Sequence, residues 1–180
     1  MKPGMSWASC AAALVLALAG SAQAAATDDL ELKVKAAFLF NFAKFTTWPP
    51  SKLKGDSSLL LCVQGAGAIG AVLEDTVRGR SVAGHPIDVL QSPRSEDLRR
   101  CHIVYIGATG DGRIAQELET LANHGVLTVH ESGEAQPGGV IRFFLSDAGR
   151  VRFEVNVTAA SREQLALSSK LLEVSKVVNR

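Results

Sequence analysis

The sequence predicts an α/β fold: a single domain with a mostly parallel sheet covered by helices on both faces, then a C-terminal antiparallel hairpin and a final helix. Two observations lead to this prediction. From residue 58 to residue 130, short, mostly apolar runs that do not alternate with polar residues are separated by amphipathic segments, as is typical of parallel strands buried on both faces. After residue 140, two strand-like runs flank a short polar turn, which indicates a hairpin.

The alternating part contains four predicted strands with helices or helical turns between them. We expect strands at 58–63, 86–90, 101–106 and 126–130. We expect helices at 68–77 and 111–123, the second closed by Gly125 in the manner of a glycine cap, and a turn or short helix at 92–98.

The last third of the chain contains the hairpin strands, 140–145 and 151–157, and a helix. The second strand alternates strictly, and its predicted solvent face carries Arg150, Arg152, Glu154 and Asn156. Residues 161–164 have the sequence Ser-Arg-Glu-Gln, which is a capping-box pattern. We therefore expect the final helix to begin at Ser161 and to turn Leu167, Leu171, Val174 and Val178 toward the core.

An apolar helix is predicted before these elements, because four of the seven Phe residues lie between positions 38 and 45. The run is too short to span a bilayer, which needs about 20 apolar residues. Its Phe side chains fit neither a period of two nor one narrow helical stripe, so two sides of the helix need cover. The helix is therefore either a core helix inside the domain or a dimer contact. The residues concerned are Phe38, Phe42, Phe45 and Trp48.

Residues 1–24 have the pattern of a secretory signal peptide. Lys2 precedes an apolar stretch at 10–20, and Ala22-Gln23-Ala24 is an A-x-A cleavage site. We expect cleavage near Ala24, which leaves an exported domain of residues 27–180 with no direct membrane insertion. An uncleaved anchor is the alternative, and the short stretch ending in small residues argues against it.

The charge balance of the predicted mature chain indicates which classes of partner it does not bind. Residues 1–24 hold one Lys and no acidic residue, so 18 of the 19 basic residues remain, against 18 acidic residues. This balance predicts neither nucleic acid nor an anionic membrane as a partner.

Cleavage leaves two cysteines, Cys62 and Cys101, which in an oxidising compartment most often form a disulfide. Two free buried cysteines, or a metal site with His102, are the alternatives.

A glycine pattern suggests a cofactor site but fits it poorly. Residues 65–70, Gly-Ala-Gly-Ala-Ile-Gly, match GxGxxG after a predicted strand. The acidic residue that would bind the ribose is Asp88, but it lies inside a predicted strand and not at its carboxyl end. A tight turn of small residues is the better interpretation, so we predict no cofactor.

No catalytic or metal-binding set assembles from the remaining residues. The four His residues are dispersed, and we interpret His102 and His130 as structural. Glu131 and Glu134 beside His130 form a small polar cluster at a strand's carboxyl end, where parallel sheets bind ligands. We therefore predict that the protein is not an enzyme.

Four stretches of the chain together resemble the YfiR/HmsC family, and the resemblance extends over about residues 30 to 178. They are KAAFLFNFAKFTTWP at 35–49, CHIVYIG at 101–107, GGVIRFFL with RVRFEVN at 138–156, and SSKLL at 168–172. The resemblance implies a small periplasmic protein that forms a homodimer and has a disulfide between Cys62 and Cys101. A second, C-terminal cysteine pair of some members is absent from this sequence.

The resemblance also implies a regulatory function. Characterised members repress an inner-membrane diguanylate cyclase of the YfiN type by binding its periplasmic region, which keeps cyclic di-GMP and biofilm formation low. An outer-membrane lipoprotein of the YfiB type can sequester the repressor. The alternative is a periplasmic small-ligand-binding sensor that uses the loops 65–70, 107–112 and 130–134.

A repressor without catalytic groups acts through a surface, and Arg is enriched in interfaces. The predicted solvent face of strand 151–157 and the polar side of the predicted last helix would form that surface. Its candidate partner-binding residues are Arg150, Arg152, Glu154, Asn156, Glu163 and Lys170.

Overall fold

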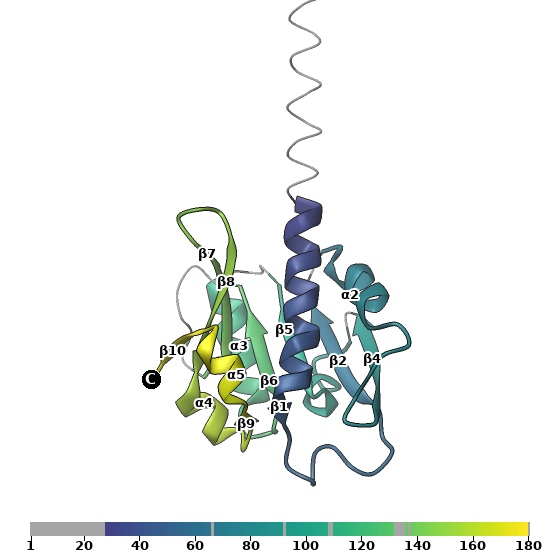
Figure 1. Cartoon of the computed structure of the whole chain (residues 1–180). Coiled ribbons are helices and arrows are strands. Elements are labelled where there is room, and N and C mark those ends of the chain that lie inside the picture. Colours follow the sequence, from purple (N-terminus) through teal and green to yellow (C-terminus); the bar gives the residue numbers. More distant parts are fainter. Residues whose placement is uncertain are drawn as a thin grey trace, which may run out of the picture.

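The computed structural model describes residues 28–65, 67–91, 93–107, 110–131, 136 and 138–179. The predicted signal peptide lies outside these residues, so its cleavage stays a prediction. Among the described residues, no helix is long and apolar enough to cross a membrane. The fold is a mixed α/β domain around one eight-stranded sheet with the order β10-β8-β7-β6-β5-β2-β4-β3 (Figure 1).

The strands of this sheet are β2 (Leu59–Gln64), β3 (Ser81–Val82), β4 (His85–Gln91), β5 (Ile103–Ile106), β6 (Leu127–His130), β7 (Ile141–Leu145), β8 (Val151–Asn156) and β10 (Lys176–Val178). Two further strands, β1 (Thr46–Thr47) and β9 (Ala166–Leu167), pair with each other. The helices are an N-terminal helix at 28–45, α2 (Ile69–Val77), the 3₁₀ turn η1 (Leu98–Arg100), α3 (Asp111–Leu121), α4 (Val157–Arg162) and α5 (Ser169–Glu173).

The five central strands, β4, β2, β5, β6 and β7, are all parallel to one another. Strand β8 then pairs antiparallel with β7, as the predicted hairpin requires, with Phe143 opposite Phe153. The predicted fold class is confirmed. Its basis is that the central parallel strands are buried on both faces: β5 and β6 are buried at every position.

Two separate apolar clusters lie on the two faces of the sheet. The N-terminal helix and α2 cover one face, with Leu39, Phe42 and Leu73 fully buried. Helix α3 and η1 cover the other, around Ile114 and Leu98. In Figure 1 the N-terminal helix crosses the near face of the sheet, beside the β7–β8 hairpin.

The Phe-rich helix is a core helix. Phe42 is fully buried, and its ring centroid lies 5.7 Å from that of Phe143 and 4.9 Å from that of Phe153. Phe38 and Phe45 are partly buried against the same core. Trp48 lies beyond the end of the helix and is 6% exposed. The core interpretation is confirmed, whereas a dimer contact through this helix stays a prediction.

The prediction of one final helix from Ser161 to Val178 is wrong. The helix begins one turn earlier, because the Asn156 side chain accepts a hydrogen bond from the Ala159 amide at 3.1 Å. It ends at Arg162, and Gln164 follows with a left-handed backbone (φ 56°). The rest becomes β9, α5 and β10. Residues 176–178, Lys-Val-Val, pair with β8, as β-branched residues favour.

The predicted solvent face of β8 is also partly wrong. Arg150 and Arg152 are exposed, but Glu154 is only 3% exposed and Asn156 only 6%. The reason is that β10 adds a further strand beside β8, with Lys176 opposite Glu154. Strand β8, which the alternation predicts to be half-exposed, is therefore covered at its carboxyl end.

The predicted disulfide is present. Cys62 in β2 and Cys101 before β5 are joined, with their Cα atoms 6.0 Å apart and both side chains fully buried. The bond ties two neighbouring strands at the centre of the sheet. It excludes the alternatives of free thiols and of a metal site that uses both sulfurs with His102.

Removing this bond should destabilise the protein. The cysteines are 39 residues apart, and the chain-entropy model gives about 3–4 kcal/mol for a loop of that length. Urea unfolding of the Cys62→Ala/Cys101→Ala variant should show this loss, and dithiothreitol should lower the wild-type stability to about the same value. The variant itself should not respond to dithiothreitol. Alkylation of both cysteines in untreated native protein would contradict the bond.

Candidate functional site

A groove of about 360 Å³ lies between the start of the N-terminal helix and the turn of the β7–β8 hairpin. The helix contributes Leu30, Val34 and Phe38, which are spaced four residues apart and so share one helix face. Leu30 is 63% exposed, because the helix begins beyond the edge of the sheet (Figure 1). The groove is thus an apolar surface that the described residues leave open.

The opposite wall of the groove is the hairpin turn, with Gly149, Arg150, Val151 and Arg152. Gly149 has a left-handed backbone (φ 66°), which glycine adopts without a steric penalty. The amide of Gly149 donates to the carbonyl of Ser146 at 2.8 Å, and the amide of Ser146 donates to the carbonyl of Arg150 at 2.9 Å. These bonds fix the turn and hold both arginines beside the apolar strip.

The rim of the groove is cationic. Arg150 and Arg152 are exposed, and neither forms an ion pair with any residue that the structure describes. The acidic residue of the rim, Glu31, is already paired with Lys35 at 2.5 Å. An apolar strip flanked by unpaired cations suits a partner segment that carries an apolar side chain next to a carboxylate.

The six residues predicted to bind a partner do not form one surface. Arg150 and Arg152 line the groove. Lys170 is exposed in α5, and Glu163 is 7% exposed at the end of α4. A role of the two arginines in partner binding stays a prediction. The sequence did not indicate Leu30 and Val34, although their four-residue spacing with Phe38 was the available signal.

Glu154 belongs to a buried ion pair. Its carboxylate accepts two hydrogen bonds from the Arg142 guanidinium, at 3.0 Å and 3.1 Å, and lies 3.9 Å from the Lys176 amine. Arg142 and Glu154 are cross-strand neighbours in the β7–β8 register. A two-pronged, buried pair of this kind is costly to break, so Glu154 stabilises the hairpin.

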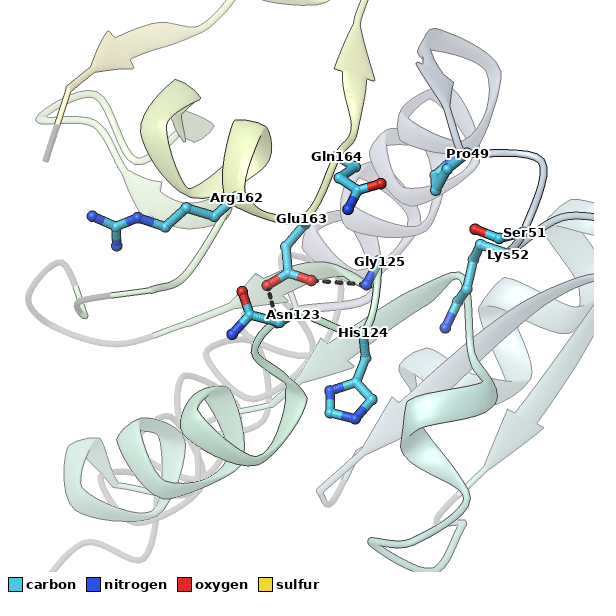
Figure 2. Close-up of a pocket in the computed structure, with 9 residues that line it drawn as sticks. All are labelled: Pro49, Ser51, Lys52, Asn123, His124, Gly125, Arg162, Glu163 and Gln164. Carbon is cyan, nitrogen blue, oxygen red and sulfur yellow. Dashed lines mark hydrogen bonds between the residues drawn. The ribbon is translucent and has the colours of Figure 1, made fainter.

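Glu163 closes a turn of the chain. Its two carboxylate oxygens accept hydrogen bonds from the amides of Asn123 at 2.7 Å, Gly125 at 2.9 Å and Val126 at 3.4 Å, and the first two are drawn in Figure 2. Asn123 and Gly125 both have left-handed backbones, which turn these amides toward one point. The carboxylate therefore fastens α4 to the turn between α3 and β6.

The predicted polar cluster at the carboxyl ends of the strands is partly occupied by the N-terminal helix. Lys35 pairs with Glu131 at 2.7 Å, and the Tyr105 hydroxyl also donates to Glu131. Burial lowers the pKa of Lys35, but its hydrogen bonds to Glu131 and Glu31 outweigh burial and raise the pKa above its ordinary value. Burial and the charge of Glu131 raise the pKa of Tyr105.

The loops at these strand ends are described only in part. Residues 66, 108–109 and 132–135, the last of which include Glu134, lie outside the described residues. Two of the glycines that are described have a positive φ, 100° at Gly65 and 143° at Gly67, as a tight turn requires. A Cβ atom on Gly70 would lie 2.3 Å from the side-chain oxygen of Gln91, an exposed side chain that could move aside. Asp88 is an exposed residue within β4.

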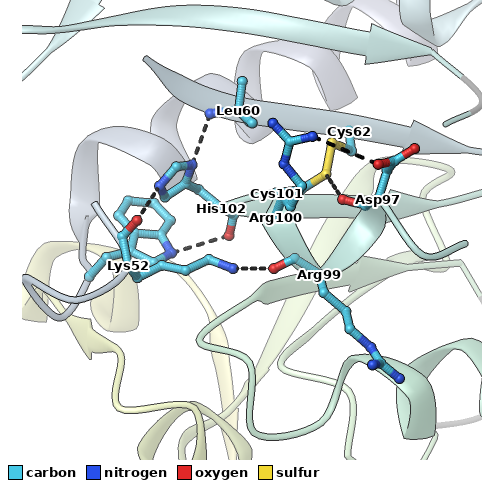
Figure 3. The surroundings of a disulfide bond; sticks show 9 residues. Lys52, Leu60, Cys62, Asp97, Arg99, Arg100, Cys101 and His102 are labelled. Atoms are coloured by element: carbon cyan, nitrogen blue, oxygen red, sulfur yellow. Dashed lines mark hydrogen bonds and ion pairs between the residues drawn. A yellow bond between two sulfur atoms is a disulfide. The ribbon is translucent and has the colours of Figure 1, made fainter. Parts of the chain in front are cut away.

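His102 has a structural role, as predicted. Its Nδ1 accepts from the Leu60 amide at 2.9 Å, and its Nε2 lies 3.2 Å from the Lys52 carbonyl, to which it donates in this tautomer (Figure 3). Its own carbonyl accepts from the Trp48 indole at 3.1 Å. Burial lowers the pKa of His102 below 6.5, so the ring is neutral at pH 7. His130 is likewise buried, at 1% exposure.

The comparisons with known proteins assign the family. A family model described as YfiR/HmsC-like matches residues 32–176. The chain belongs to this family. Membership indicates a periplasmic regulator of diguanylate cyclase signalling and a regulatory, non-catalytic type of protein.

The other comparisons add little to the YfiR/HmsC-like assignment. No curated protein matched the chain. Among solved structures, the chain is similar to the ABC domain in complex with L-Trp from Streptococcus pneumonia, with 10% identity and a TM-score of 0.42. That match covers 68% of this chain and 55% of the other.

Acidification should weaken the fold through His102. Because burial lowers its pKa in the folded state, the unfolded chain binds more protons as the pH falls below about 6.5. The stability contributed by the neutral ring is therefore present above pH 6.5 and is lost below it, by at most about 1.4 kcal/mol per pH unit. Urea unfolding between pH 7.5 and pH 5 measures the slope, and NMR titration of the ring measures the pKa directly. A value of 6.5 or more would contradict this prediction, and His124→Gln, a change at an exposed ring, should keep the slope.

Glu163→Ala should destabilise the protein by roughly 2–4 kcal/mol, because three amides of one turn lose their acceptor. Chemical denaturation measures the loss. Glu173→Ala, which changes an exposed Glu in α5, is the matched control and should stay near the wild-type value. Equal stabilities of the two variants would show that Glu163 does not fasten the turn.

Proposed function

We propose that this protein is a periplasmic regulatory binding protein that represses an inner-membrane diguanylate cyclase, or a related sensor, by binding its periplasmic region. Repression lowers cyclic di-GMP and biofilm formation. The observation that carries the proposal is the YfiR/HmsC-like match over residues 32–176. A homodimer and an outer-membrane lipoprotein of the YfiB type that sequesters the repressor belong to the same proposal.

The groove supplies a surface for this function. Binding energy in interfaces concentrates in a few apolar or aromatic anchors surrounded by polar residues. Leu30, Val34 and Phe38 form an apolar floor, and Arg150 and Arg152 supply charge at its border. A side chain of the cyclase inserted here would be held by apolar contact, while a neighbouring carboxylate would set its register through the arginines.

The walls of the groove are also packed directly against each other, which suits an inhibitor that holds its partner in one conformation. Phe38 packs against Phe153 with ring centroids 5.2 Å apart, so the helix and the hairpin are joined directly beneath the groove. Binding therefore orders few groups, which keeps its entropic cost low. A rigid partner of this kind can hold a sensor region in one conformation by binding that conformation better than the others.

The second candidate function is a small-ligand-binding sensor. The partly occupied cluster of Lys35, Glu131 and Tyr105 shows that the carboxyl ends of β5 and β6 are in part filled by the protein's own helix. This observation favours a binding protein over a sensor that takes its ligand at that edge of the sheet.

The Val34→Asp/Arg152→Glu variant should bind the cyclase more weakly than the wild type does. Both side chains line the groove, so a carboxylate in the apolar floor and a reversed charge at the rim should weaken binding at least about tenfold, which is about 1.4 kcal/mol. A pull-down from detergent-solubilised membranes, followed by a measurement of cellular cyclic di-GMP, tests this. Thermal unfolding must show that the variant is folded.

Arg78→Glu is the control, because Arg78 is exposed in the turn after α2, away from the groove. It should capture the cyclase and repress it as the wild type does. Normal repression by the folded groove variant would place the interface elsewhere, with the remaining exposed face of the N-terminal helix next in order. Glu154→Arg is unsuitable for this test, because it would break the buried pair with Arg142.

A further inference from the structure

A second, polar pocket of about 260 Å³ lies at the opposite edge of the sheet, beside the amino ends of β5 and β6. Three loops that are distant in sequence form it: the turn after Pro49, the turn between α3 and β6, and the end of α4 (Figure 2). Its lining side chains are mainly hydrogen-bond donors, among them Ser51, Lys52, Asn123 and Gln164.

Lys52 is a partly buried cation in the lining of this pocket. Its amine donates to the carbonyl of Arg99 at 2.6 Å (Figure 3), but it forms no ion pair with any residue that the structure describes. The side chain is half-buried. Burial lowers the pKa of Lys52 to about 8, although the charge of Glu163 opposes this change. A cation taken out of water without a counter-ion is costly, and an anion that entered the pocket would reduce that cost.

The nearby carboxylate of Glu163 raises the pKa of Lys52 by its charge, but it forms no direct ion pair with the Lys52 amine. Glu163 accepts hydrogen bonds from three backbone amides, so its negative charge is already compensated by their dipoles. In Figure 2 its oxygens face the Asn123–Gly125 turn, whereas Lys52 extends from the separate turn after Pro49. The ammonium group therefore keeps unused N–H donors.

The backbone around the pocket is held in an uncommon conformation. Asn123 (φ 61°) and Gln164 (φ 56°) both lie in the left-handed region and both line the pocket. Asn adopts this region readily, but Gln does so rarely. Side chains held in place by strained backbone are a feature of binding sites.

We propose that this pocket binds a small anionic solute through the Lys52 ammonium group, with the side chains of Ser51, Asn123 and Gln164 as further donors. Its volume is below the roughly 300–1,000 Å³ of sites for drug-sized ligands, which fits a solute of a few carbon atoms. Carboxylate and phosphate groups share the required chemistry. The site is separate from the groove, so its failure would leave the proposed function untouched.

Isothermal titration of the protein purified from the periplasmic fraction tests this, with succinate and inorganic phosphate as probes and uncharged succinamide as the control. We expect saturable binding of at least one anion at pH 7 and none of succinamide. Binding of succinate alone would identify a carboxylate site, and binding of phosphate alone a phosphate site. No saturable heat for either anion up to tens of millimolar would overturn the proposal.

Two comparisons assign the binding to Lys52. Lys52→Met should weaken it at least tenfold, whereas Lys54→Met, an exposed lysine two residues away, should leave it unchanged. In the wild type, affinity should fall at least tenfold between pH 7 and pH 9.5, because Lys52 loses its proton near pH 8, well below an ordinary lysine. The pH series needs no variant, so it decides the matter even if Lys52→Met fails to fold. Equal affinity for Lys52→Met, or affinity that does not change with pH, would refute the assignment.

Discussion

The packing of the N-terminal helix on the sheet is the interaction on which the rest of the structure depends. Phe38 and Phe42 lie against Phe143 and Phe153, with centroid distances of 4.9–6.0 Å, so the first described element is joined to the hairpin near the end of the chain. Lys35 joins the same helix to the centre of the sheet through Glu131. The helix also creates the groove, because Leu30 and Val34 extend beyond the part that the sheet covers.

The parallel half of the fold could be predicted because its signals are local. Strands β2, β5 and β6 are mostly apolar runs, which are typical of parallel strands buried on both faces. The prediction for the last third of the chain failed because two local signals competed. Ser161 and Gln164 match a capping box, but Asn156 is also a good cap, one turn earlier. The structure uses Asn156, and Gln164 lies after the end of the helix with a left-handed backbone.

The buried charges show why most of the candidate site could not be read from the sequence. Strict alternation in 151–157 correctly placed Arg152 outward, but Glu154 is on the same face and is buried. What differs is its surroundings: Arg142 from β7 and Lys176 from β10 both lie beside Glu154. Lys35 and Glu131 are likewise 96 residues apart. Polar residues far apart in sequence gave no pattern, because only the fold brings them together.

The groove and the Lys52 pocket lie at opposite edges of the sheet, yet both are built on one segment. The N-terminal helix contains the groove residues Leu30 and Phe38. Beyond its end, the Trp48 indole and the Lys52 carbonyl both contact His102. A shared segment does not by itself couple two sites. Coupling requires an element with two arrangements that each ligand prefers differently. If the helix has only one arrangement, changes at Lys52 and at Arg152 should have additive effects on cyclase binding, whereas an interaction energy between them would show that the helix transmits a signal from one edge of the sheet to the other.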